Sequence, residues 1–202
     1  MIALPIPMIV SFALVALLAR ALLRRDNQNS LMALIGVCAI QSLIIALHGY
    51  YGFVELRAVQ PLVASLIPPM AWFAFRNAAG KLPGTFLAFA HALGPVGISG
   101  ALIVNPAMID LIIPALFLGY GIAILIILSR GEEVLPNTRL ESGNLPLFAW
   151  RGLAASLVAS AFCDVAISLS LAAGAGETAK MTASAVSSIS LLTLGVLSYA
   201  YA

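Results

Sequence analysis

The sequence predicts an all-α polytopic membrane protein with seven transmembrane helices, an N-terminus outside and a C-terminus in the cytoplasm. Three observations support this prediction. First, 62% of the 202 residues are hydrophobic and only 9% are charged, whereas soluble domains carry about 25% charged residues. Second, seven apolar stretches each have the roughly 20 residues that a helix needs to cross a bilayer. Third, the basic residues gather on one side of these stretches, as the positive-inside rule requires.

The seven apolar stretches follow one another with mostly short connectors, so we expect consecutive helices to be antiparallel neighbours. Their expected bounds are Ile2–Leu23, Leu31–Tyr50, Val59–Ala78, Thr85–Val104, Met108–Leu128, Leu147–Leu171 and Thr182–Tyr201. The longest connector, Ser129–Pro146, divides the chain into five helices and a final pair. Open sheets are excluded, because every backbone polar group in lipid must find its partner within the protein.

Charge placement sets the expected orientation. The first stretch has no basic segment before it, which distinguishes it from a signal peptide. With its N-terminus outside, eight basic residues fall on the inner side, namely Arg20, Arg24, Arg25, Arg76, Lys81, Arg130, Arg139 and Arg151. Only Arg57 and Lys180 fall on the outer side. The last stretch runs to Ala202 without a polar flank, so we expect the native protein to continue in the cytoplasm.

Several polar residues fall in or beside the expected spans, where an ionisable group costs roughly 2.5–3.5 kcal/mol to insert. Five of them lie toward the outer half of the membrane and form a candidate ligand pocket: Gln41, His48, Gln60, Asp110 and Asp164. Other interpretations stay open for two of these residues. Asp110 also suits a helix start, which the helix dipole favours, and His48 also suits an anchor at the membrane interface.

Asp164 belongs to a stripe of small and polar residues spaced four apart, which places them on one helix face. The stripe comprises Gly152, Ser156, Ser160, Asp164 and Ser168. Small residues let another helix approach closely, so one interpretation is a packing face against the last helix, which offers Ser184 and Ser188. The other interpretation makes Asp164 part of a ligand pocket.

The third stretch carries a candidate hinge or relay, formed by Pro68, Pro69, Trp72 and Arg76. Prolines inside a helix remove backbone hydrogen bonds and kink it. The segment therefore fits a hinge that passes motion from the outer to the inner side. A structural kink followed by an anchor at the inner surface is the alternative.

An enzymatic site is not expected. Residues 97–100 read GISG, matching the GxSG of rhomboid-type intramembrane proteases. In rhomboids the catalytic histidine comes from a later helix, whereas His48 and His91 both precede Ser99. We therefore expect Gly97 and Gly100 to serve close helix packing.

Cofactor chemistry is not expected either. A retinal protein needs a lysine in the middle of its last helix, and the only lysines, Lys81 and Lys180, fall at helix ends. No metal-binding motif is present, and Cys38 and Cys163 lie within apolar runs as small core residues. We expect no cofactor and no metal.

Five segments resemble the membrane-embedded N-terminal domain of a subset of bacterial AraC-family transcription regulators. They are LLRRD at 22–26, AIQSL at 39–43, LIPPMAWFAFR at 66–76, LPLFAW at 145–150 and CDVA at 163–166. The resemblance implies a sensor in the bacterial inner membrane, followed by a cytoplasmic helix-turn-helix domain. That DNA-binding domain is not within these 202 residues.

We therefore expect a membrane sensory domain that passes an extracytoplasmic or intramembrane signal to a DNA-binding output. Its expected partners are the lipid bilayer, a small-molecule or membrane signal, and DNA only through the output domain. A homodimer is also expected, because many such regulators read paired half-sites. The alternative is a small permease or substrate-binding membrane protein.

Overall fold

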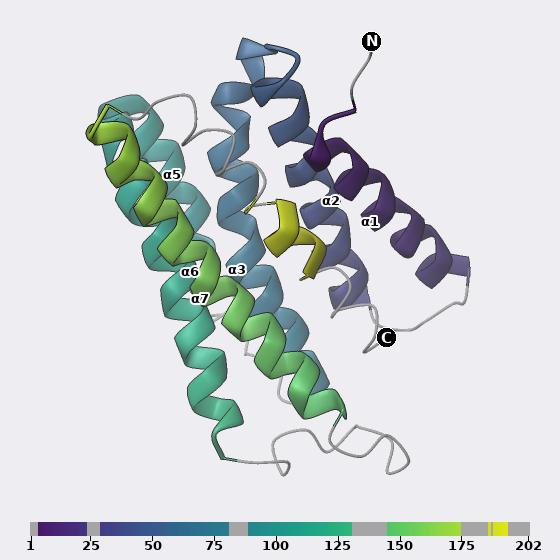
Figure 1. Cartoon of the computed structure of the whole chain (residues 1–202). Helices are drawn as coiled ribbons and strands as arrows, with labels where there is room; N and C mark the ends of the chain where they lie inside the picture. The colour runs from purple at the N-terminus through teal and green to yellow at the C-terminus, as the bar shows by residue number, and fades with distance from the viewer. Residues whose placement is uncertain are drawn as a thin grey trace.

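A computed structural model describes residues 4–23, 29–80, 89–130, 145–174, 186 and 188–193, and the elements among them are all helical. The α-helices are α1 (Ile6–Leu23), α2 (Asn29–Gly49), α3 (Val59–Ala78), α5 (Leu93–Val104), α6 (Ile109–Leu128) and α7 (Leu145–Ala172). Two short 3-10 helices, η1 (Val54–Arg57) and η2 (Pro106–Met108), precede α3 and α6 (Figure 1). Residues 188–193 add a helical segment beside α3 and α7.

Five of the described helical segments are long and apolar enough to cross a membrane. They are Ile6–Leu23, Asn29–Gly49, Val54–Ala78, Pro106–Leu128 and Leu147–Ser170. Large apolar side chains also cover the outside of the bundle, among them Phe12 on α1, Leu111 on α6 and Phe162 on α7. A surface of this kind is stable in hydrocarbon rather than in water. By helix length and hydropathy, the chain is a multi-pass membrane protein.

The fourth expected span differs from the prediction. Instead of one helix over Thr85–Val104, a turn at His91 and Ala92 precedes α5, which has only 12 residues. Pro95 supplies the reason, because it has no N–H to donate to the carbonyl four residues earlier, that of His91. Residues 81–88 lie outside the described part of the chain, as does most of the seventh expected span over 182–201.

The helices alternate in direction, as expected from the short connectors. We call the end where α1, α3 and α6 begin and α2, α5 and α7 end the upper end, and the opposite end the lower end (Figure 1). The helices α1, α2 and α3 form one closely packed group, and α6 and α7 form a second. The helix α5 packs against α3 and α6, and the contact between α3 and α6 joins the two groups along a seam.

Buried serines connect the first group. The Ser42 hydroxyl donates to the Pro7 carbonyl at 2.7 Å, and the Ser11 hydroxyl donates to the Ala39 carbonyl at 3.0 Å. Each bond crosses from one helix to its neighbour. Near the lower end, the Asn77 amide donates to the Ser30 hydroxyl at 3.1 Å and links α3 to α2.

Close packing in the second group depends on Gly121. A Cβ built on this residue would lie 2.8 Å from Val158 Cγ2 and 3.1 Å from the Ala154 carbonyl oxygen of α7. The glycines of the GxSG segment do not have the expected role, because a Cβ on Gly97 or Gly100 meets no described atom within 4 Å. Gly97 and Gly100 are exposed whereas Ile98 between them is buried, so neither glycine brings two described helices closer together.

Candidate functional site

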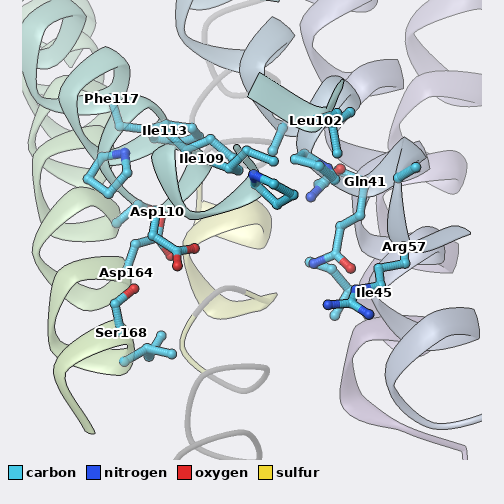
Figure 2. Close-up of a pocket in the computed structure, with 18 of the residues that line it drawn as sticks. Gln41, Ile45, Arg57, Leu102, Ile109, Asp110, Ile113, Phe117, Asp164 and Ser168 are labelled. Carbon is cyan, nitrogen blue, oxygen red and sulfur yellow. The ribbon is translucent and has the colours of Figure 1, made fainter. Parts of the chain in front are cut away.

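A cavity of about 1060 Å³ lies near the upper end, on the seam between the two helical groups (Figure 2). Its first wall comes from α2, η1 and α3, and its second wall comes from η2, α6 and α7, with Leu102 of α5 and Leu191 completing it. The polar residues among its lining are Gln41, Glu55, Arg57, Gln60, Asp110, Ser160, Asp164 and Ser168. The described residues therefore place a cluster of polar side chains in an open cavity between two packed apolar bodies. Glu55, Arg57 and Asp110 in this cluster are exposed, whereas Gln41 is buried.

Gln41 is the most deeply buried polar group of the first wall. Its residue is 5% exposed, and its Oε1 atom has no hydrogen-bond partner among the described residues. The side chain extends from α2 into the cavity (Figure 2). An amide acceptor without a partner in a buried site costs roughly 1–3 kcal/mol. A hydrogen-bond donor bound in the cavity would remove this cost.

The proline pair adds a second acceptor to this wall. Pro68 and Pro69 lie inside α3 and are both buried. Neither can donate a backbone hydrogen bond, so the carbonyls of Ala64 and Ser65 lose their usual donors four residues later. Ala64 lines the cavity beside Ile67. The wall thus carries the Gln41 amide oxygen, and the stretch of α3 that contains Ala64 has two carbonyls without their usual helical donors.

The second wall carries two carboxylates from adjoining helices. Asp110 lies in the first turn of α6, and Asp164 lies near the upper end of α7. Their charges are close enough to repel each other, and Figure 2 shows them together across the cavity from Gln41 and Arg57. Ser160 and Ser168, one turn before and after Asp164, line the same wall.

Four of the five residues predicted as a pocket therefore line one cavity: Gln41, Gln60, Asp110 and Asp164. His48 is not among the lining residues. Its Nδ1 atom lies 3.1 Å from the Phe53 carbonyl and ties the end of α2 to the following turn. The stripe of small residues on α7 has two parts. In the lower part, the Ser156 hydroxyl donates to the Gly152 carbonyl of the same helix. The upper part, formed by Ser160, Asp164 and Ser168, lines the cavity.

Two charged lining residues, Glu55 and Arg57, come from η1, which leads directly into α3. Their position before the third expected span already indicated the outer side, together with the predicted pocket residues. Apolar lining residues, such as Ile113 and Phe117 of α6, could not be predicted, because the sequence does not distinguish them from other apolar residues of a membrane helix. The Ala64 carbonyl had a detectable signal, since any residue four before a buried proline loses its helical donor.

The predicted hinge residues Trp72 and Arg76 lie below the cavity on the same helix. The Trp72 ring contacts Tyr120 of α6, with centroids 6.2 Å apart, and the Arg76 guanidinium lies over the Trp72 ring at 5.8 Å. His91 joins this cluster, with its Nδ1 atom 2.5 Å from the Tyr120 hydroxyl. One turn further down, Phe75 meets Trp150 of α7 at 5.4 Å. We call these rings the aromatic cluster.

Within the described residues, no group of three or more histidine, cysteine, aspartate or glutamate side chains is placed to hold a metal ion. No protein-family model, curated protein or solved structure matches the chain. The resemblance to AraC-family membrane domains therefore depends on the sequence segments alone, and arguments about function depend on the cavity and the seam.

Proposed function

We propose that the chain is a membrane-embedded sensory domain, in which a signal molecule occupies the cavity and the helices pass this event to a cytoplasmic helix-turn-helix output. One observation carries the proposal. The same two helical groups line the cavity at the upper end and meet through the aromatic cluster nearer the lower end. A change in spacing at one end of the seam must be accommodated at the other.

A ligand shifts a conformational equilibrium only by its difference in affinity for the two states. A cavity inside one rigid group would offer no such difference, because its walls would not move relative to each other. This cavity has one wall in each group, so its ligand contacts depend on how the groups are positioned. Packed helices respond to such biases by shifts of about 1–2 Å.

The helix α3 is the proposed relay. It lines the cavity at Ala64 and Ile67, contains the proline pair in its middle, and carries Trp72 and Phe75 of the aromatic cluster below. A helix that lacks two adjacent backbone bonds bends there more readily than elsewhere. The two halves of α3 can therefore bend relative to each other at the proline pair.

The proposed membrane arrangement keeps seven spans, with the N-terminus outside and the C-terminus in the cytoplasm. The basic residues support it, since Arg76, Arg130 and Arg151 lie toward the lower end and Arg57 alone of the described basic residues lies at the upper end. In this orientation the cavity is near the outer surface and the aromatic cluster is nearer the cytoplasm. The two remaining spans are proposed for residues 85–104, through α5, and for 182–201.

The proposal can be tested without a known ligand by filling the cavity with a side chain. Ile167 of α7 lines the cavity, whereas Leu169 on the same helix is 66% exposed. The variants Ile167→Trp and Leu169→Trp add the same bulk, but only the first one occupies the cavity. Spin labels on Asn29→Cys and Ser129→Cys, in a Cys163→Ser background that leaves only the buried Cys38, report the distance between the groups at the lower end.

We expect Ile167→Trp to change the label distance by about 2 Å and Leu169→Trp to leave it unchanged. Equal distances in both variants and in the parent protein, with all three folded by circular dichroism, would refute transmission along the seam. The DNA-binding output is tested separately, by reading the native gene beyond codon 202. A coding region for a helix-turn-helix domain there supports the regulator, and a stop codon argues against it.

A small permease is the second candidate, and the position of the cavity favours it too. Transporters also bind their substrates between two helical bodies that rock against each other. Reconstituted protein that moves a cavity ligand across vesicle membranes would favour transport. A sensor should bind the same ligand without net flux.

A further inference from the structure

We propose that the cavity binds a small organic cation, a primary amine with an apolar carbon chain, whose ammonium group lies at Asp110 and Asp164. The inference rests on the proposed function only in assuming that the cavity is a ligand site. It adds the chemical class of the ligand, which three features of the lining support.

The first feature is the excess of hydrogen-bond acceptors. The Oε1 atom of Gln41 is buried without a donor. The Ala64 carbonyl lacks its helical donor because Pro68 has no N–H. Asp110 and Asp164 add carboxylate oxygens, which only accept when ionised. Arg57, Gln60, Ser160 and Ser168 add donors to the lining, but the two ionised aspartates only accept. An ammonium group placed there is a compact donor of three hydrogen bonds without an acceptor.

The second feature is charge. Three acidic side chains line the cavity, Glu55, Asp110 and Asp164, against one basic side chain, Arg57. The two aspartates lie close together, and Arg57 is on the opposite side (Figure 2). Asp110 is exposed and Asp164 is partly buried. Their like charges repel each other, and an opposite charge placed between them removes that repulsion. A cation placed at the aspartates therefore gains from both carboxylates at once.

The third feature is the apolar remainder. Ile45 and Ile67 line the first wall, and Ile113, Phe117 and Ile167 line the second. A fully hydrated ion would leave these surfaces facing water. A carbon chain attached to the ammonium group would cover them, at about 0.8 kcal/mol for each buried CH₂. Binding pockets for small organic molecules commonly combine apolar walls with a few convergent polar groups.

The test uses four probes of equal chain length that differ only in their end groups: hexylamine, hexanediamine, hexanediol and hexanedioate. Binding to the full chain in detergent micelles is measured by isothermal titration calorimetry and by the shift in unfolding temperature. We expect the two amines to bind and to stabilise the protein, and we expect the diol and the dicarboxylate to bind at least about ten-fold more weakly.

Three variants locate the binding site. Asp164→Asn and Asp110→Asn keep the side-chain shape and remove the charge, so each should weaken amine binding about ten-fold or more. Gln41→Leu changes the wall opposite the aspartates, so it should weaken binding of hexanediamine, whose second ammonium can reach that wall, more than binding of hexylamine. It should also raise the unfolding temperature of the free protein, because a buried acceptor without a described donor is removed. Ser170→Ala is the matched control, since Ser170 lies on α7 outside the cavity and bonds to the Ala166 carbonyl of its own helix. It should bind amines like the parent protein.

The outcomes separate this inference from the proposed function. Tighter binding of hexanediol or hexanedioate than of the amines, lost in Ile167→Trp, would leave a ligand site but overturn the cationic class. Amine binding unchanged in both aspartate variants would overturn the assignment of the ammonium group. If no probe binds the folded protein, the cationic class is refuted, whereas the label distances in Ile167→Trp still decide whether the cavity communicates with the lower end.

Discussion

Gly121 permits the closest approach between α6 and α7, so a single added methyl group there is expected to force these helices apart. The Cβ of an alanine would lie 2.8 Å from Val158 Cγ2, about 0.6 Å inside the 3.4 Å at which ordinary van der Waals contact begins. Val158 can adjust its rotamer. The Ala154 carbonyl oxygen at 3.1 Å cannot, because it is part of the α7 backbone.

The magnitude follows from two opposing effects. Overpacking a well-packed interface costs typically 1–3 kcal/mol. Replacing glycine by alanine within a helix returns up to about 1 kcal/mol of helix propensity. We therefore expect Gly121→Ala to lower the free energy of unfolding by about 1–2 kcal/mol. Gly121→Val, with two further methyl groups, should cost more.

The assay is reversible unfolding in mixed micelles, followed by circular dichroism. Gly119→Ala is the matched control, because Gly119 is on the same helix, two residues earlier, and a Cβ there meets nothing described within 4 Å. Its variant should be as stable as the parent protein or slightly more so. Equal stability of the two alanine variants would refute the reasoning, since it would mean that α6 and α7 do not meet through Gly121.

Three further predictions concern the bundle and its relay. Ser42→Ala should destabilise the fold by about 0.5–1.5 kcal/mol, because it removes a 2.7 Å hydrogen bond between α2 and α1; denaturant unfolding measures it. Tyr120→Phe should keep the ring packing but lose the hydroxyl contact to His91, costing about 1 kcal/mol, whereas Tyr120→Ala should cost several-fold more in the same assay. Replacing Pro68 and Pro69 together by alanine should raise the unfolding temperature, because two backbone donors return, and should reduce the lower-end distance change caused by filling the cavity.

Much of the bundle followed from the sequence because a bilayer permits few alternatives. The apolar length of each stretch and the placement of the arginines are enough to define α1, α2, α3, α6 and α7 to within a few residues. The break before α5 was missed because its hydropathy is continuous there. A hydropathy profile does not reveal Pro95 as a helix breaker, because proline interrupts a helix by removing the donor to one particular backbone carbonyl. The α7 start at Leu145, two residues earlier than expected, also lies in apolar sequence.

The polar lining was predictable to the extent that helical periodicity and the cost of burial apply. Asp164 and its serine neighbours share a face by their spacing of four residues, and Gln41 stands out as an amide in an apolar helix. Periodicity does not reveal which helix lies opposite. His48 had the same polarity and depth as the lining residues, but it bonds locally to the Phe53 carbonyl. Composition does not separate a histidine that closes a turn from one that faces a cavity.

The division of the chain also changed in a way that bears on function. The long connector over Ser129–Pro146 suggested five helices followed by a final pair, yet α6 and α7, which flank it, have the most extensive contact of any two described helices. Arg151 of α7 reinforces this contact by donating to the Leu128 carbonyl at the end of α6, at 3.4 Å. Among the described helices, the contact between α3 and α6 is therefore the weaker one, and the proposed movement would occur there. Because the two aspartates lie on one side of that contact and Gln41 lies on the other, a ligand that contacts all three would hold the two groups in one position.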